Sequence, residues 1–355
     1  MSSPPSLGLR RKGIKTLPTL PLSAFGPPGS GASGASPLPP SPSAIHPDQV
    51  IDAHVVSLTG DLSQWKKEAG ETLETRIGGV VLSLQGTDPT EIEKVVTGLE
   101  PSAAPPILSV LVPFSLDAAP PSEVPPHLSA SAKIPTFLST TFVKNGPESA
   151  SALSWALQNS KTVDIDIRSD LATNDPLWEG FEEMLTAATK PEEGKTLGSI
   201  ILSNILPPPH DLTLPIVRLM KHPTYETYQS HTAALSLFPN CYVKFLPPAW
   251  DAPTPSTPAA GASFESSQST LSVQNELEQK IEWKRRIKMY LGPVVEAFGY
   301  ERIIFGSSHS SASTAQSSAG DWYEIARESF AELGIDQEAV NNVFFNNARK
   351  VYGSA

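Results

Sequence analysis

The chain has 355 residues, with 26 Lys and Arg against 37 Asp and Glu, and a formal net charge of −11. Phosphate binding requires clustered Lys and Arg, so this balance argues against a nucleic-acid-binding protein. The sequence contains no apolar run of about eighteen residues, so we expect no membrane-spanning helix. The single Cys241 can form no internal disulfide and suits a reducing compartment. We therefore expect a cytoplasmic protein.

Two segments have the composition of disordered chain. Residues 1–44 are rich in Pro, Ser and Gly and lack apolar periodicity, so they cannot bury enough surface to offset the entropy of ordering. The first 47 residues also hold four basic and no acidic residues, which resembles an organellar transit peptide and leaves a mitochondrial location as the weaker alternative. A second stretch, at about 251–272, predicts a flexible insertion in one surface loop of the remaining domain, 45–355.

Eight short apolar segments recur along the remaining domain. Each is rich in Val, Ile or Leu and bounded by Gly, Pro, Asn or Asp, which is typical of parallel strands buried on both faces. The predicted strands are 50–56, 77–84, 107–114, 134–141, 162–167, 199–204, 241–246 and 302–307. Most are separated by stretches long enough for a helix, such as 88–99, 147–159, 176–189 and 225–238. This alternation predicts a (β/α)8 TIM barrel, with a doubly wound open sheet as the structural alternative.

One predicted helix carries a local basic run. Residues 280–288 contain Lys284, Arg285 and Arg286, and three acidic residues lie on the same helix at Glu276, Glu278 and Glu282. Opposite charges spaced along one helix favour ion pairs within it. We expect a solvated, ion-paired helix face here and no nucleic-acid site.

Four motifs together resemble the amidohydrolase-related family. They are Val-Ile-Asp-Ala-His-Val at 50–55, Tyr-Val-Lys at 242–244, Tyr-Glu-Arg-Ile-Ile-Phe-Gly-Ser at 300–307 and Asn-Ala-Arg-Lys-Val-Tyr-Gly at 347–353. The resemblance spans about 45–353 and is most specific near the C-terminus. It implies a TIM barrel of the kind found in metal-dependent hydrolases and decarboxylases that act on lactones, amides and related carboxylic compounds.

The resemblance also shows where this chain departs from the family. The family's first strand ends in Asp-x-His-x-His, of which Asp52 and His54 match, whereas Val56 replaces the second histidine. Asn204 replaces a later histidine, and Ser308 replaces the aspartate that follows Phe-Gly-Ser. The resemblance implies a divalent metal such as zinc, with His54 as the one ligand retained. A catalytic zinc needs about three protein ligands, so the standard metal site is incomplete.

The remaining polar residues at the predicted strand ends are candidates for the site. Lys244 matches the family's lysine on the seventh strand. Asp52 and His54, two residues apart, are predicted to share a face and to be hydrogen-bonded. His54, His309 and Asp166 form a conceivable compensating metal site. The candidate catalytic residues are His54, Lys244 and Asp166, and the candidate substrate-binding residues are Asp52, Asn204, Ser308 and His309.

Two functions of different classes follow. The first is a hydrolase of a small carboxylic ester, lactone or amide, with a rebuilt or metal-independent site. The second is a catalytically inactive barrel, a pseudoenzyme that serves as a binding or scaffolding module. The substitutions at Val56, Asn204 and Ser308 favour the second, and the retained Asp52, His54 and Lys244 favour the first. The fold alone does not choose between them, because function depends on the site.

Overall fold

A computed structural model of the protein describes residues 44–100, 104–128, 133–190, 197–205, 212, 214–238, 240–250, 252–257, 270–311, 313, 315 and 317–353. For 270–274 it describes the backbone alone. The disorder predicted for 1–44 therefore concerns residues outside the described ones, apart from Ala44. The same holds for most of the predicted insertion at 251–272, and Thr270 already begins a helix.

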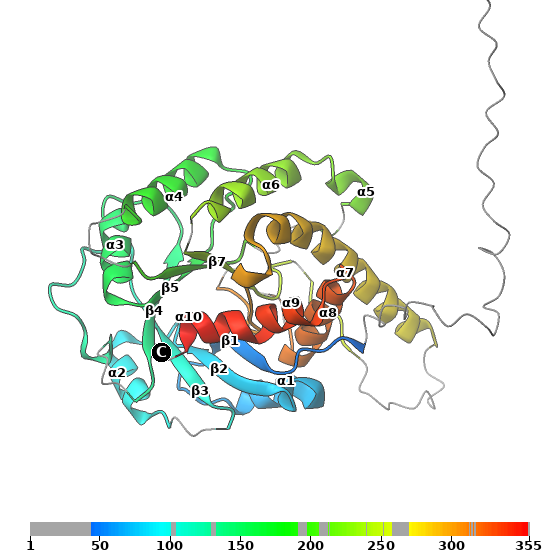
Figure 1. Ribbon diagram of the computed structural model, residues 1–355, viewed down its shortest axis with the longest axis horizontal. Coiled ribbons are helices and arrows are strands. Elements are labelled where there is room, and N and C mark those ends of the chain that lie inside the picture. The colour runs from blue at the N-terminus through cyan, green and yellow to red at the C-terminus, as the bar shows by residue number, and fades with distance from the viewer. Residues whose placement is uncertain are drawn as a thin grey trace, which may run out of the picture. The chain divides into compact units, whose positions relative to one another are not determined.

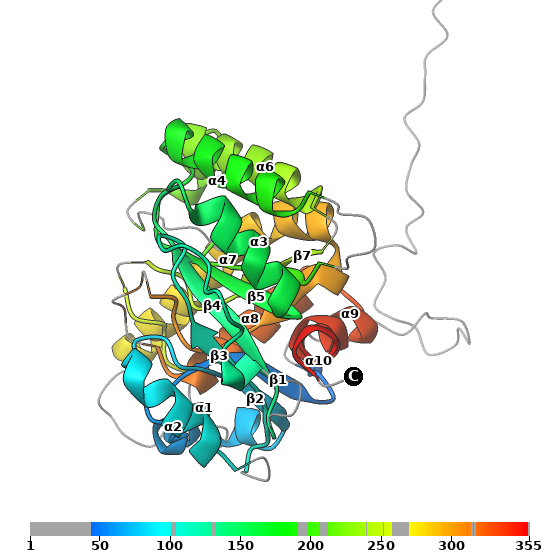
Figure 2. The same cartoon turned by 90° about the vertical axis from the view of Figure 1, so that its left-hand side faces the viewer.

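Eight parallel strands form one sheet in the order of the chain, and helices surround it (Figures 1 and 2). The strands are β1 (Val50–Val56), β2 (Ile77–Ser83), β3 (Ile107–Pro113), β4 (Thr136–Phe142), β5 (Thr162–Ile167), β6 (Ser199–Ser203), β7 (Cys241–Phe245) and β8 (Ile303–Phe305). The chain after β8 returns to β1, where Ser308 N donates a hydrogen bond to His54 O at 2.9 Å. This contact brings the last strand beside the first, and the predicted (β/α)8 barrel is confirmed.

The helices begin with recognisable capping residues. Asp88 accepts a hydrogen bond from Thr90 N before α2, and Asn174 accepts one from Leu177 N before α4. None of the described helices is long and apolar enough to cross a membrane. The α-helices are α1 (Ser63–Glu74), α2 (Pro89–Gly98), α3 (Ser149–Asn159), α4 (Asp175–Ala188), α5 (Ile216–Leu219), α6 (Pro223–Ser236), α7 (Thr270–Phe298), α8 (Ala319–Ala331), α9 (Gln337–Asn341) and α10 (Asn347–Tyr352). Short 3-10 helices lie at Pro126–Leu128 and Tyr300–Arg302, and a π-helix at Asn342–Asn346 joins α9 to α10.

Alternating residues of each strand pack into two separate cores. One face of the strands packs against the surrounding helices, and the other fills the barrel, as the period of two along a strand requires. The residues of the inner core are Ile51, Ala53, Val81, Leu111, Phe137, Ile201, Tyr242 and Ile304, joined by Ala348, Val351 and Tyr352 of α10. α10 therefore packs into the barrel itself (Figure 1).

α10 covers the N-terminal end of the barrel. At the start of β5, Thr162 Oγ1 donates to Val351 O at 2.7 Å, and Lys161 Nζ donates to Gly353 O at 2.9 Å. Active sites of TIM barrels lie at the opposite end, where the strands terminate. The polar residues of interest are accordingly those near the C-terminal ends of the strands.

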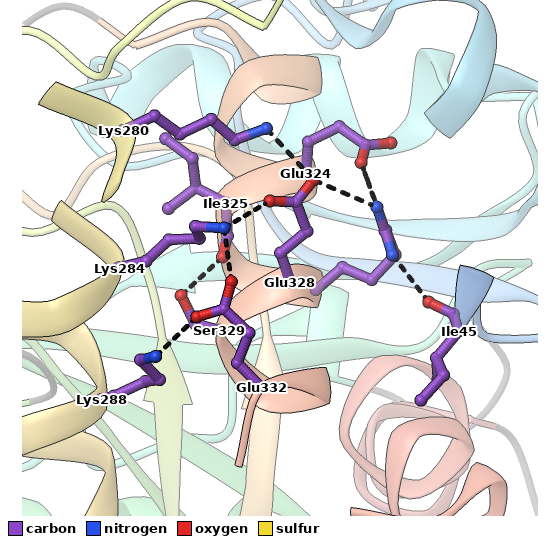
Figure 3. Close-up of polar contacts among 10 residues, drawn as sticks. Ile45, Lys280, Lys284, Lys288, Glu324, Ile325, Glu328, Ser329 and Glu332 are labelled. Carbon is purple, nitrogen blue, oxygen red and sulfur yellow. Dashed lines mark hydrogen bonds and ion pairs between the residues drawn. The ribbon is translucent and has the colours of Figure 1, made fainter. Parts of the chain in front are cut away.

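A ladder of ion pairs joins α7 to α8 (Figure 3). Lys280 and Lys284 contact Glu328 at 3.1 and 2.9 Å, and Lys284 and Lys288 both contact Glu332. These side chains are largely buried, with exposed fractions of 12–26%. The predicted solvated face was wrong for these lysines, because their partners lie on the neighbouring helix and the pairs are packed between the two helices.

Two arginines complete this region. Arg286 pairs with Glu282 of its own helix at 2.8 Å, which confirms the predicted pairing within α7 for this residue. On α8, Arg327 pairs with Glu324 and donates from Nη1 to Ile45 O at 2.7 Å (Figure 3). This second arginine therefore ties the segment before β1 to the helical layer.

Candidate functional site

Because β1 contains a bulge, the side chains of Asp52 and His54 point in different directions. The register to β2 shifts between Asp52 and Val55, so that Ala53 and His54 together stand opposite one residue of β2. Asp52 consequently faces Trp65 of α1, whereas Ala53 belongs to the inner core. The prediction that Asp52 and His54 share a face was wrong, because strict alternation fails at a bulge.

Asp52 lies in the wall of the barrel. It is fully buried and accepts hydrogen bonds from Trp65 Nε1 at 2.8 Å, Ser307 N at 2.8 Å, Ser307 Oγ and the backbone N of His54 at 3.2 Å. Burial raises the pKa of this carboxyl above its ordinary value, and the hydrogen bonds from Ser307 and Trp65 act against that rise. Both oxygens are engaged, and they join β1, α1 and the end of β8.

His54 is buried without a hydrogen bond to its ring. Its exposed fraction is 5%, and neither ring nitrogen forms a hydrogen bond with another described residue. Burial lowers its pKa well below the ordinary value, and the charge of Lys244 lowers it further, while the backbone of His309 acts in the opposite direction. The lowered pKa favours a neutral imidazole, whose ring lies close to the backbone of His309.

Lys244 is fully buried in a polar network. Its ammonium group forms an ion pair with Asp164 Oδ2, and the other oxygen, Oδ1, accepts a hydrogen bond from Tyr352 OH at 2.7 Å. Burial raises the pKa of Asp164, and the charge and hydrogen bond of Lys244 act against that rise. Tyr352 belongs to α10, so the network connects β5 and β7 to the helix that covers the other end of the barrel.

Asp166 lies two residues beyond Asp164, nearer the C-terminal end of β5. Its Oδ2 accepts hydrogen bonds from Ser311 N at 2.8 Å, from Ser311 Oγ and from Gln85 Nε2 at 3.5 Å. Its Oδ1 is buried and has no hydrogen-bond partner among the described residues. The carboxylate therefore has one oxygen engaged and one free.

The segment after β8 crosses the mouth of the barrel. Ser308 is fixed on β1, since its N donates to His54 O and its Oγ accepts from Val56 N at 3.1 Å. Three residues further on, Ser311 is fixed on Asp166 of β5. Between them His309 is half-buried, and burial lowers its pKa. The two predicted substrate-binding residues of this segment, Ser308 and His309, therefore lie over the barrel beside His54.

A close approach of strands explains the glycine of the Phe-Gly-Ser motif. A Cβ added to Gly306 would lie 2.8 Å from His54 Cβ and 2.7 Å from Leu246 Cδ2. No side chain fits between β8 and β1 at this point. Gly306 thus allows Ser307 and Ser308 to reach their partners on β1.

Asn204 lies apart from the other candidates. It adopts a left-handed backbone with φ of 64°, and its Nδ2 donates to Ile167 O at 2.6 Å. The side chain therefore holds the end of β5 to the end of β6. Asparagine is one of the residues that can adopt this backbone conformation.

The residues at the mouth do not fit the metal that the family resemblance implies. At the three positions where this chain departs from the family, Val56 is apolar, Asn204 is bonded to Ile167, and the hydroxyl of Ser308 is bonded to Val56 N. Among the described residues, no three His, Cys, Asp or Glu side chains lie close enough together to hold a metal ion. A catalytic zinc needs about three such ligands.

The compensating metal site suggested by the sequence is not formed either. His54, His309 and Asp166 are all described, and they do not make a group that could hold a metal. Asp166 accepts a hydrogen bond from Ser311. The ammonium group of Lys244 lies near enough to His54 to lower the pKa of the imidazole.

Several residues of this site had no signal in the sequence. Ser311 lies in a serine-rich run, where one serine cannot be distinguished from its neighbours. Ser83 ends an apolar strand and Gln85 follows it, both as ordinary polar residues. Tyr352 lies within the motif that resembles the family, but its hydrogen bond to Asp164 inside the barrel could not be inferred from that motif.

Comparison with known proteins supports the fold. No protein-family model and no curated protein sequence matches this chain. The structure is similar to an amidohydrolase from Burkholderia multivorans with bound HEPES, at a TM-score of 0.52 and 13% identity, covering 86% of this chain and 99% of the other. A second crystal form of an amidohydrolase from that organism, with bound zinc, gives a TM-score of 0.50 with the same identity and coverage. The chain therefore shares the TIM-barrel fold of these structures.

Proposed function

We propose that this chain is an amidohydrolase-fold protein that binds a small polar molecule at the mouth of its barrel without metal-dependent hydrolysis. One observation carries the proposal. The three residues expected to act together are held separately, with Lys244 paired to Asp164, Asp166 bonded to Ser311, and His54 unpaired. A concerted acid–base site needs its members within hydrogen-bond reach of one reacting atom.

Among the residues that the structure describes, none at the mouth supports the chemistry of metal-dependent hydrolysis. A bound metal activates water by its charge, and a nearby base accepts the water proton. The base position of the family holds Ser308, whose Oγ accepts a hydrogen bond from Val56 N. Lys244 is neutralised by Asp164 and is not free to stabilise a developing negative charge.

Binding is supported by the polar atoms that remain unused. His54 has two unpaired ring nitrogens, and Asp166 has one unpaired oxygen, although both side chains are more than nine-tenths buried. Buried polar groups in native proteins are nearly always hydrogen-bonded. A bound polar molecule at the mouth would supply these partners.

A second function is favoured by one specific observation, the neutral and unpaired imidazole of His54. Such a group can accept a proton from water without any metal. The second proposal is therefore a metal-independent hydrolase of a small ester, lactone or amide, with His54 as the general base.

Metal analysis and activity measurements on one preparation test both proposals. The purified full chain is analysed by elemental mass spectrometry and assayed on a panel of lactones, aryl esters and amides, with and without added zinc. We expect far less than one metal per chain and no turnover that depends on zinc. Stoichiometric metal that is lost in His54→Ala would refute the first proposal. Zinc-independent turnover that is lost in His54→Ala and kept in His231→Ala, a histidine of α6 outside the mouth, would establish the second.

A further inference from the structure

Unpaired polar atoms from three strands gather near the mouth of the barrel. They are both ring nitrogens of His54 on β1, Oγ of Ser83 at the end of β2, and Oδ1 of Asp166 near the end of β5. The three residues have exposed fractions of 5%, 1% and 7%. A buried polar atom without a partner is costly, so four of them on three residues near the ends of β1, β2 and β5 indicate a site for a ligand.

The contacts of neighbouring residues place these side chains around the mouth. Gln85, two residues beyond Ser83, reaches across to Asp166 Oδ2 and to Thr141 Oγ1 at 3.5 and 3.2 Å. The end of β2 therefore meets the ends of β4 and β5 inside the mouth. His54 lies beside Ser308 and His309. These two residues belong to the segment that continues to Ser311, which donates a hydrogen bond to Asp166.

The charges of the mouth determine what kind of ligand fits. Lys244 and Asp164 neutralise one another, and the hydrogen bonds that Asp166 accepts from described residues come from the uncharged Ser311 and Gln85. Within the described part of the chain, no cationic side chain forms an ion pair with Asp166. Arg168, two residues along, is exposed and makes no such pair. One carboxylate charge at the mouth thus lacks a counter-ion.

We infer that the mouth takes a small amine in its protonated form, with the ammonium group donating to Asp166 Oδ1 and a polar group of the ligand meeting His54 and Ser83. This inference rests on the proposed binding function and names its ligand class. An ammonium supplies both the donors and the positive charge that Asp166 lacks. A carboxylate ligand supplies neither, and it would place a like charge beside Asp166.

Three probes with the same two-carbon skeleton test the inference: ethanolamine, ethylene glycol and glycolate, which carry positive, zero and negative charge. Their binding to the purified full chain at neutral pH is measured by isothermal titration calorimetry. We expect ethanolamine to bind at least about tenfold more tightly than ethylene glycol, because a charge-assisted hydrogen bond replaces a neutral one, and glycolate to bind least. Equal binding of ethanolamine and ethylene glycol, or tighter binding of glycolate, would overturn the inference.

Two variants locate the preference. Asp166→Asn keeps the shape of the side chain and removes its charge, so the preference for ethanolamine should disappear. Glu71→Gln, at an exposed position on α1 away from the mouth, is the control, so the preference should persist in it. A preference unchanged in Asp166→Asn contradicts the inference. The comparison of the three probes on the unmodified chain decides it even where a variant fails to fold.

The result separates this inference from the proposed function. If ethanolamine does not bind to a metal-free, inactive chain, small amines are excluded as the ligand class. The proposed binding function would then concern other ligands. Stoichiometric metal or zinc-dependent turnover would refute the proposed function, whatever the order of affinity of the three probes.

Discussion

Lys244 and Asp164 form an ion pair inside the barrel, on β7 and β5, with β6 between them. Tyr352 OH bonds the second oxygen of the carboxylate at 2.7 Å, and the lysine ammonium lies 5.2 Å from the centre of the Tyr352 ring. The lysine that matches the family is therefore committed to an internal network that holds α10 in the barrel. Because of this commitment, Lys244 need not act on a substrate.

Replacing Lys244 with Met tests that structural role. The change leaves the charge of Asp164 buried without its partner, so we expect the free energy of unfolding to fall by about 3–5 kcal/mol. Urea denaturation followed by circular dichroism measures it. The double variant Lys244→Met, Asp164→Leu should recover most of the loss, because no unpaired charge remains. A loss below about 1 kcal/mol in the single variant would contradict a structural pair.

The ion-pair ladder between α7 and α8 predicts a dependence of stability on pH. Burial acts to raise the pKa of Glu328 and of Glu332, but hydrogen bonds and charges from Lys280, Lys284 and Lys288 outweigh it, and both pKa values lie below the ordinary value. A lowered pKa in the folded state gives stability that is fully present above the unfolded pKa and is lost as the pH falls through the folded pKa.

The variant Glu328→Gln, Glu332→Gln should remove that part of the pH dependence. We expect the unfolding free energy of the unmodified chain to decline on acidification below about pH 4.5, and that of the variant to decline less steeply. Denaturation at a series of pH values measures the two curves. Glu71→Gln, at an exposed position on α1, is the matched control and should follow the unmodified chain. If the curves of the double variant and of the unmodified chain were parallel, the ladder would not contribute to the pH dependence of stability.

His54 should contribute more to binding than to stability. Replacement by Leu removes two buried unpaired nitrogens and keeps an apolar side chain of similar size, so we expect the unfolding free energy to be unchanged or to rise by about 1 kcal/mol. Ethanolamine binding should weaken in the same variant. Thermal denaturation without ligand measures the first effect. A loss above about 2 kcal/mol would instead assign His54 a supporting role in the fold.

Gly306→Ala should destabilise the closure of the barrel. The added methyl group would approach His54 Cβ and Leu246 Cδ2 to within 3 Å, so β8 must move away from β1. We expect a loss of about 1–3 kcal/mol, measured by chemical denaturation. Gly98→Ala, at the end of α2, meets no atom within 4 Å and should be neutral or slightly stabilising. Similar effects of the two substitutions would show that the contact at Gly306 is unimportant.

The barrel was predictable from the sequence because its strands carry their signal locally. A parallel strand buried on both faces is a short apolar run, and all eight predicted runs are strands. The ends are less well predicted. The segment 302–307 contains only the three-residue β8, since Arg302 ends a 3-10 helix and Gly306 begins the crossing of the mouth.

The candidate site depended on contacts that no local pattern contains. The sequence by itself determined that ionisable residues such as Lys244 and Asp164 lie in apolar strands. Only the tertiary structure decided that these two are partners, that Ser311 is bonded to Asp166, and that a bulge turns His54 away from the face of Asp52. Strand formation reflects neighbours along the chain, whereas the pairing of buried charges depends on barrel closure and register, which bring together residues 80 and 145 positions apart.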